Sequence, residues 1–161
     1  MSTPQPGSWS GGCQCGAVRF RAGSLGRPSL CHCRMCQKAF ASVGGLLVTA
    51  NDLAWTRGGP KYFQSSNKVR RGFCGDCGTP LTYEYPGGVE VAIVAFDRAG
   101  EIAPVIQHAR AARLPWFDSL TGLPVRTPEE EARAAAFYAG IASRQHPDHD
   151  TEAWPAQEGV A

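Results

Sequence analysis

Seven cysteines in three short clusters constrain the fold of this chain more than any other feature of its sequence. They are spaced as Cys13-x-Cys15, Cys31-x-Cys33-x-x-Cys36 and Cys74-x-x-Cys77. Structural zinc takes four protein ligands, and catalytic zinc usually takes three. Seven thiolates therefore predict two zinc ions per chain, one in a closed site and one in a site with a vacant ligand position.

A disulfide framework fits this pattern poorly. Such frameworks belong to short secreted chains with even cysteine counts. This chain begins MSTPQPGSWS, which contains no apolar signal-peptide region. Cysteines one or two residues apart bond awkwardly to each other, but they chelate one ion easily. We therefore expect metal binding in a reducing cytoplasm.

Length and charge set further limits. The 161 residues suffice for one domain with a buried core, and no apolar run approaches the roughly 18 residues that span a membrane. Residues 1–75 carry ten Lys or Arg and one acid, whereas residues 76–161 carry six basic and thirteen acidic residues. Neutralisation of thiolates explains this asymmetry better than an anion-binding surface does. The basic residues are not clustered, which argues against a nucleic-acid partner.

The residue pattern predicts short strands first and a helix last. A tail over 1–10 precedes a zinc-binding domain over 11–124. Polar–apolar alternation between glycine and proline turns predicts strands over 17–22, 45–50, 62–64, 69–73, 81–85 and 89–96. In the extension over 125–161, a capping box at Thr127-Pro128-Glu129-Glu130 predicts a helix over about 128–143. The polar stretch 145–161 is expected to be frayed.

The spacing alone leaves the pairing of the clusters open. Cys13 and Cys15 can join Cys74 and Cys77, which leaves the three cysteines of the middle cluster with a vacant position. They can equally join Cys31 and Cys33, and the remaining site then contains the other three cysteines. His32 lies between two ligands and is expected to point away from the metal.

Four segments carry a resemblance to a known family: GGCQCGAVRF, CHCRMCQKAFAS, RRGFCGDCGTPL and HARAARLPWFDSLTGLP. Together they resemble the glutathione-dependent formaldehyde-activating enzyme family, whose domain also occurs in centromere protein V. The resemblance implies a mainly β, Mss4-like fold of short antiparallel strands. It also implies two roles for the cysteines: a structural zinc held by Cys13, Cys15, Cys74 and Cys77, and a catalytic zinc held by Cys31, Cys33 and Cys36.

The activity implied is that of a carbon–sulfur lyase, which joins formaldehyde to glutathione as S-hydroxymethylglutathione or runs in reverse. Arg34 and Lys38 flank the catalytic cluster and are candidate contacts for substrate carboxylates. His108 is a candidate proton shuttle. It stands in His108-Ala109-Arg110, where relatives usually read HIW, so their aromatic contact is missing. Trp116 is expected in the core.

Two alternatives to an enzyme remain at this point. One is a zinc-binding scaffold without catalytic activity, as the centromere relative suggests. The other is a thiol-redox switch in which oxidation of Cys31, Cys33 and Cys36 releases zinc. The expected partners are a small thiol such as glutathione and a further copy of the chain in a homo-oligomer.

Overall fold

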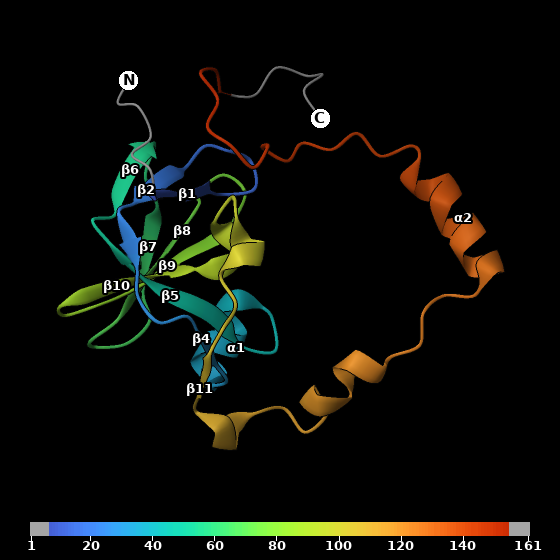
Figure 1. Ribbon diagram of the computed structural model, residues 1–161, viewed down its shortest axis with the longest axis horizontal. Coiled ribbons are helices and arrows are strands. Elements are labelled where there is room, and N and C mark those ends of the chain that lie inside the picture. Colours follow the sequence, from blue (N-terminus) through green and yellow to red (C-terminus); the bar gives the residue numbers. More distant parts are fainter. Residues whose placement is uncertain (1–6, 155–161) are drawn as a thin grey trace.

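Two β-sheets form the body of the protein in the computed structural model, which describes residues 7–154 (Figure 1). The smaller sheet has the order β1 (Trp9–Gly12), β2 (Arg19–Ala22) and β6 (Ala54–Arg57). The larger sheet has the order β11-β4-β5-β10-β9-β8-β7, with β3 paired to β5. The strands of this larger sheet are β3 (Ser24–Leu25), β4 (Ser29–Cys31), β5 (Gly45–Asn51), β7 (Lys61–Gln64), β8 (Arg70–Phe73), β9 (Pro80–Tyr85), β10 (Gly88–Ala92) and β11 (Ile106–His108). The pairing of β11 with β4 is parallel, and the other pairings between these strands are antiparallel.

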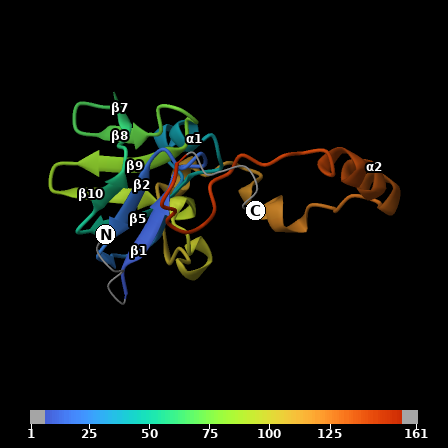
Figure 2. The ribbon, with the colours of Figure 1, turned by 90° about the horizontal axis from the view of Figure 1, so that it is seen from above.

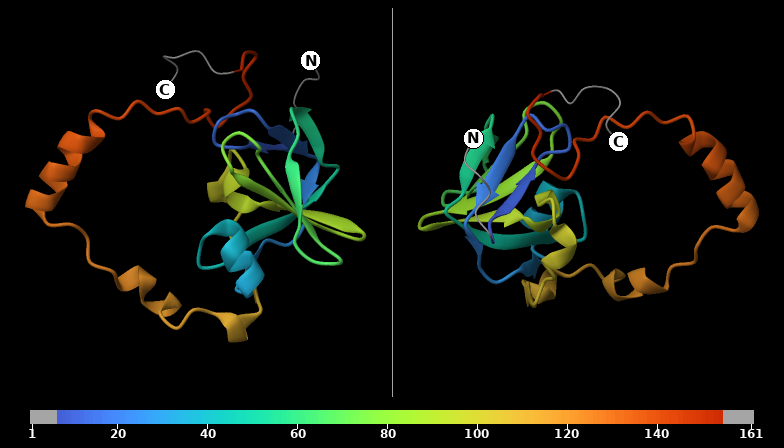
Figure 3. Two further views of the ribbon diagram at one scale, coloured as in Figure 1. Left: turned by 180° about the vertical axis from the view of Figure 1, so that it is seen from behind. Right: turned by 45° about the horizontal axis from the view of Figure 1, so that its top comes forward.

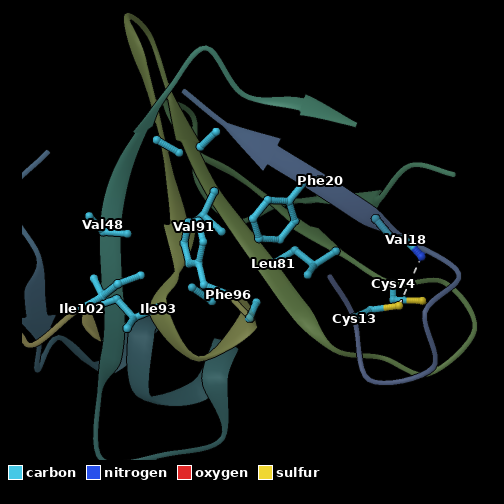
Figure 4. Packing of buried hydrophobic residues seen from close by; sticks show 14 residues of the cluster. Cys13, Val18, Phe20, Val48, Cys74, Leu81, Val91, Ile93, Phe96 and Ile102 are labelled. Atoms are coloured by element: carbon cyan, nitrogen blue, oxygen red, sulfur yellow. Dashed lines mark hydrogen bonds between the residues drawn. The ribbon is translucent and has the colours of Figure 1, made fainter. Parts of the chain in front are cut away.

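The core contains apolar side chains from both sheets. Phe20 of β2 lies edge-on to Phe96, with ring centroids 5.0 Å apart, and Leu81 and Val91 are also fully buried (Figure 4). The same cluster of buried residues includes Cys13, beside Val18 at one end. The first cysteine cluster is therefore built onto the end of the hydrophobic core.

The mainly β class is confirmed, and the six predicted strands are present with shifted ends. The strand expected over 89–96 stops at Ala92, because a 3₁₀ turn, η1 (Ile93–Ala95), follows it. Strands β1, β3, β4, β6 and β11 were not predicted, and neither was the helix α1 (Arg34–Phe40). Helix α1 was missed because its N-cap is Cys33, whose Sγ accepts a hydrogen bond from the backbone N–H of Cys36. The N-cap residues by which a helix start is recognised in a sequence are Ser, Thr, Asp and Asn, and cysteine is not among them.

Residues 109–144 form a long arc that leaves the body after β11 and returns to it (Figures 1 and 3). After the 3₁₀ turn η2 (Ala99–Glu101) and strand β11, the arc carries η3 (Arg110–Ala112), η4 (Phe117–Gly122) and α2 (Pro128–Tyr138). The predicted capping box at Thr127 is present. The helix ends at Tyr138 rather than near residue 143, just before Gly140, a poor helix former. No side chain of α2 is buried, and Figure 2 shows the helix far from the sheets.

Residues 145–154, here called the C-terminal strap, return to the body and pack on the first cysteine cluster. The backbone N–H of His146 donates to the carbonyl of Gln14 at 2.7 Å, and the indole N–H of Trp154 donates to the carbonyl of Cys15 at 2.7 Å. Asp150 forms ion pairs with Arg19 and with a second arginine, Arg21. The prediction of a frayed C-terminus is therefore wrong for the strap, while residues 155–161 lie outside the described residues. Within residues 7–154, no helix has the combination of length and apolar character that crossing a bilayer requires.

Gly16 should be the position where the strap is most sensitive to substitution. Its φ is +80°, and an added Cβ would lie 2.1 Å from the ring of His146. Gly78 has a similar φ of +77° but nothing within 4 Å of an added Cβ. We expect Gly78→Ala to cost about 1 kcal/mol through backbone strain alone. Gly16→Ala should cost more and should also release the strap.

Hydrogen–deuterium exchange of the peptide that contains His146 measures this release directly. Its amide should exchange faster in Gly16→Ala and at the native rate in Gly78→Ala. Equal protection in both variants would show that the strap does not depend on contact with Gly16.

Candidate metal centres

The structure brings Cys13, Cys15, Cys74 and Cys77 together, with all four sulfur atoms within 4.8 Å of one another. The Cys13 and Cys15 sulfurs are 3.6 Å apart, and those of Cys15 and Cys74 are 3.8 Å apart. A tetrahedral zinc with Zn–S bonds of about 2.3 Å requires sulfur separations of about 3.8 Å. The donor set and its spacing therefore fit a closed Cys₄ site, and we call these residues the four-cysteine cluster.

Hydrogen bonds around this cluster favour thiolates. The backbone N–H groups of Val18 and Asp76 donate to the sulfurs of Cys13 and Cys74, at 3.3 and 3.4 Å. Burial acts to raise the pKa of Cys77, but hydrogen bonds from the Thr79 hydroxyl and from backbone N–H groups outweigh it and lower the pKa to about 6. Such contacts favour the charged form at Cys77. Burial raises the pKa of Cys15 to about 12 and also raises that of Cys74, so a bound metal ion would have to displace protons at these two ligands.

The other three cysteines form a second group, the three-cysteine cluster. The sulfurs of Cys31, Cys33 and Cys36 also lie within 4.8 Å of one another. Strand β4 supplies Cys31, and the first turn of α1 supplies Cys36, while Cys33 caps that helix. Cys36 is buried, whereas Cys31 and Cys33 are half-buried. Three sulfur donors fit a zinc ion with one position left for another ligand. This grouping is the first of the two pairings that the spacing allowed.

Arg71, on β8, lies against the three-cysteine cluster and was missed by the sequence analysis. It is only 7% exposed, and its Nη2 donates to the sulfur of Cys36 at 3.5 Å. The guanidinium lies over the ring of Tyr83 at 4.9 Å and near that of Phe40 at 5.9 Å. Nε and Nη1 have no hydrogen-bond partner within residues 7–154. Leaving buried donors unpaired costs about 1–3 kcal/mol each. The sequence did contain a signal for a buried arginine here. Consecutive residues of a strand face opposite sides, so one of the pair Arg70-Arg71 had to point inward.

The charge of Arg71 affects the cysteines beside it. Burial raises the pKa of Cys36 to about 12, and Arg71 acts against this rise. At Cys33, burial also acts to raise the pKa, but the N–H of Cys36, the neighbouring thiols and the charge of Arg71 together lower it. Burial also raises the pKa of Cys31, so the cluster combines two thiols of raised pKa with one of lowered pKa.

Tyr83 and Glu90 are further residues on this side of the sheet. Arg71, Tyr83 and Glu90 form a row across β8, β9 and β10, since Arg71 pairs with Tyr83 and Tyr83 with Glu90. Burial and the negative charges of Cys36, Glu90 and Cys31 raise the pKa of Tyr83, so its phenol stays protonated. Burial also raises the pKa of Glu90, and the charge of His108 opposes this rise. The row places the phenol of Tyr83 beside the arginine that contacts Cys36, and the half-buried carboxyl of Glu90 one strand further away.

His32 and His108 lie near the cluster in different ways. His32 is fully buried and points away from the three-cysteine cluster, as expected. Its Nε2 lies 2.9 Å from Oε1 of Gln107, and its ring is edge-on to Phe117. His108 ends β11 directly beside Cys31 of β4, and its carbonyl accepts from the N–H of His32. Its side chain is exposed.

The two residues predicted to contact substrate carboxylates lie on the surface. Arg34 and Lys38 are exposed on α1, and Arg34 donates to the side chain of Gln37 at 3.3 Å. Gln37 itself is buried and joins α1 to η3 by donating to the carbonyls of His32 and Ala112. The expectation that Trp116 belongs to the core is wrong, because this residue is half exposed on the arc.

The family model of the glutathione-dependent formaldehyde-activating enzyme matches residues 8–111, which include all seven cysteines. The chain belongs to this family. No curated protein matches it. Among solved structures, a crystal structure of a Rhodobacter sphaeroides protein is similar, with a TM-score of 0.49 and 20% sequence identity over 61% of this chain and 98% of that chain.

Two cavities lie near the candidate metal sites of this family member. A cleft of about 630 Å³ lies beside the four-cysteine cluster, between Cys77 and the strap residues His146 and Pro147. A smaller cavity of about 170 Å³ is lined by Phe40, Phe63 and Arg71. None of Cys31, Cys33 and Cys36 lines either cavity, so neither cavity marks the open position of the three-cysteine cluster.

Purified protein should contain two zinc ions of unequal lability. The four-cysteine cluster is closed and partly within the core, whereas Cys31 and Cys33 are accessible to a chelator. We expect mild chelation to remove about half of the metal without unfolding the chain. Elemental analysis and a thiol titration before and after chelation measure this. A single tightly held ion with three free thiols would remove the proposed second metal site.

Proposed function

We propose that this protein is a zinc-dependent carbon–sulfur lyase that acts on a small thiol or its aldehyde adduct. The observation that carries the proposal is the three-cysteine cluster, which supplies one ligand fewer than a closed zinc site. Family membership supports a reaction of the type S-hydroxymethylglutathione ⇌ glutathione + formaldehyde. A bound zinc ion would act there as a Lewis acid that keeps a thiol ligand in its thiolate form.

The residues around the cluster suit this chemistry. In the direction of adduct formation, the sulfur of the bound thiol forms a bond to the carbonyl carbon of the aldehyde, and the carbonyl electron pair moves to oxygen. The oxygen then needs a proton, and Tyr83 is the proposed donor because its phenol ring lies against the guanidinium of Arg71, which contacts Cys36. The proton that the incoming thiol releases passes to solvent, and His108, which is exposed and ends β11 beside Cys31, is the candidate carrier.

Glutathione is the proposed thiol, and Arg34 and Lys38 are the proposed surface contacts for its carboxylates. Both residues are exposed beside the cluster. Such contacts weaken as salt is added. A cytoplasmic location, in which the cysteines stay reduced and glutathione is present, is part of the same proposal.

Cobalt substitution makes thiol binding visible, since the ligand-field bands of cobalt respond to a fourth sulfur donor. We expect glutathione to shift the bands of the cobalt-loaded protein with saturable affinity. Cys33→Ser, which removes one ligand of the three-cysteine cluster, should show no such shift. A response to simple thiols but not to glutathione would keep the thiol chemistry and exclude the named substrate.

The scaffold alternative also has one observation in its favour. The arc exposes large apolar side chains, and their exposure does not stabilise a monomer. They include Trp116, Leu123, Val125, Phe137, Tyr138 and Ile141. Phe137 alone is 70% exposed. If no thiol changes the cobalt spectrum, this surface is the feature on which a scaffold function would depend.

A further inference from the structure

Strand β7 is an open edge of the larger sheet. It pairs with β8 on one side, and within residues 7–154 no strand pairs with its other side (Figure 2). All of its residues are exposed, and the two at its centre are aromatic: Tyr62 is 40% exposed and Phe63 is 64% exposed. Proteins usually protect an edge strand with charged residues, proline or a bulge. An edge with aromatic residues at its centre indicates instead that another strand covers it.

The backbone of β7 offers free hydrogen-bonding groups along this edge. The N–H of Ser65 donates to the carbonyl of Val69 at 3.0 Å, in the turn that joins β7 to β8. Because the backbone groups of an antiparallel strand face its two sides alternately, those of Phe63 also face β8. The N–H and C=O groups of Tyr62 and Gln64 therefore face the open edge.

A second copy of the chain fits these groups in one antiparallel register. A twofold axis through Phe63 pairs Tyr62 of each copy with Gln64 of the other, and each such pair exchanges both of its N–H···O=C bonds. A register centred on Tyr62 would instead pair Gln64 with Pro60, which has no N–H. The register centred on Phe63 therefore uses the free groups of both residues.

The side chains in this register are compatible with one another. Phe63 lies opposite its own copy in a pair without hydrogen bonds, where side chains approach closely and aromatic pairs are favourable. Lys61 lies opposite Ser65, so no like charges face each other across the new pairing. Phe63 also lines the cavity of about 170 Å³ together with Phe40 and Phe73. The second Phe63 ring would therefore lie on the side of the sheet that contains an apolar cavity.

We infer that β7 is a dimerisation edge, at which two copies of the chain join their larger sheets through antiparallel β7–β7 pairing centred on Phe63. The self-complementary order of residues 61–65 favours a second copy over a strand of another protein. Stable interfaces bury roughly 1,200–2,000 Å², and so short a strand buries less, so the dimer is a weak one. The inference names the surface of the homo-oligomer expected from the sequence, and it does not depend on thiol binding or on lyase activity.

Sedimentation velocity of the metal-loaded full chain over a range of concentrations measures this dimer. We expect a monomer–dimer equilibrium with a dissociation constant on the order of 10–100 µM. Phe63→Glu places like charges opposite each other and should weaken the dimer at least about tenfold. Val105→Glu is the matched control, because Val105 is 65% exposed but lies just before β11, at the opposite edge of the sheet. It should leave the dissociation constant unchanged.

Gln64→Pro tests the backbone pairing separately from the side chains. Proline removes the N–H that faces the open edge and leaves the N–H groups that face β8. Gln64→Ala keeps this N–H but loses the hydrogen bonds that the side chain donates to Ser66 and Val69. We expect Gln64→Pro to weaken the dimer at least about tenfold and Gln64→Ala by no more than about twofold. Circular dichroism and metal content show whether the variants fold; if Gln64→Pro does not, the wild type and Phe63→Glu decide.

Three outcomes would overturn the inference. A wild type that stays monomeric at millimolar concentration would leave β7 as an edge for a strand of another protein. A dimer that Phe63→Glu leaves intact would be formed by another surface of the chain. Loss of the dimer in Val105→Glu but not in Phe63→Glu would place the interface at the opposite edge of the sheet.

Discussion

Cys77→Ser should prevent the chain from folding, whereas Cys33→Ser should leave a folded protein with one metal ion. Binding of a structural zinc ion contributes on the order of 10 kcal/mol to folding, which is comparable with the whole stability of a domain of this size. Cys77 belongs to the four-cysteine cluster, which joins the loop after β1 to the loop after β8 at the end of the core. Loss of this ligand therefore affects the core directly.

Cys33→Ser provides the matched comparison because it also replaces a cysteine ligand by serine. Cys33 caps α1 by accepting the N–H of Cys36, and serine is itself a good N-cap residue, so the helix should keep its start. We expect a change in stability of about 1 kcal/mol or less apart from the lost metal. Thermal melts followed by circular dichroism, together with metal content, measure both variants. If Cys33→Ser unfolded and Cys77→Ser did not, the assignment of the structural site would be wrong.

The second large loss of folding stability is expected for Asp97→Ala. Arg19 is 3% exposed and donates to both carboxylate oxygens of Asp97, at 2.8 and 2.6 Å. Removing one partner of a buried pair leaves the other charge uncompensated and costs about 3 kcal/mol or more. Asp150 of the strap also contacts Arg19, but its side chain is 40% exposed and its charge is screened by solvent. Asp150 therefore cannot replace Asp97.

Urea unfolding of Asp97→Ala and Glu101→Ala measures this difference. Glu101 pairs with Arg98 on the surface, so its removal should cost no more than about 1 kcal/mol. Similar losses in the two variants would show that the buried pair contributes no more than an exposed one.

The same ion pairs give the attachment of the strap a pH dependence. Burial acts to raise the pKa of Asp150, but hydrogen bonds and charges from Arg19 and Arg21 outweigh it and lower the pKa below its usual value. A carboxyl group with a lowered pKa in the folded state contributes stability at neutral pH that is lost as the pH falls through that pKa. The strap contact through Asp150 is therefore weakened only in acid.

Local patterns in the sequence were sufficient to predict several elements of the fold. The capping box at Thr127 gave the start of α2, because its hydrogen bonds join residues three apart. Alternation gave β2 and β5, since a strand that buries one face repeats every two residues. Strand β11 could not be found in this way, because its three residues form too short a pattern and depend on pairing with β4.

The cysteine spacing determined that this chain has clusters able to hold metal and how many sulfur donors are available, because chelation by nearby residues is a local property of the chain. Only the tertiary structure decided which cysteines share a site, since Cys15 and Cys74 are brought to 3.8 Å by strands far apart in sequence. It likewise decided that Arg71 rather than Arg70 faces the cysteines, because strand pairing fixes which face of β8 is buried. The docking of the strap on Gly16 also depends on contacts between distant residues, whose free energy no local pattern encodes.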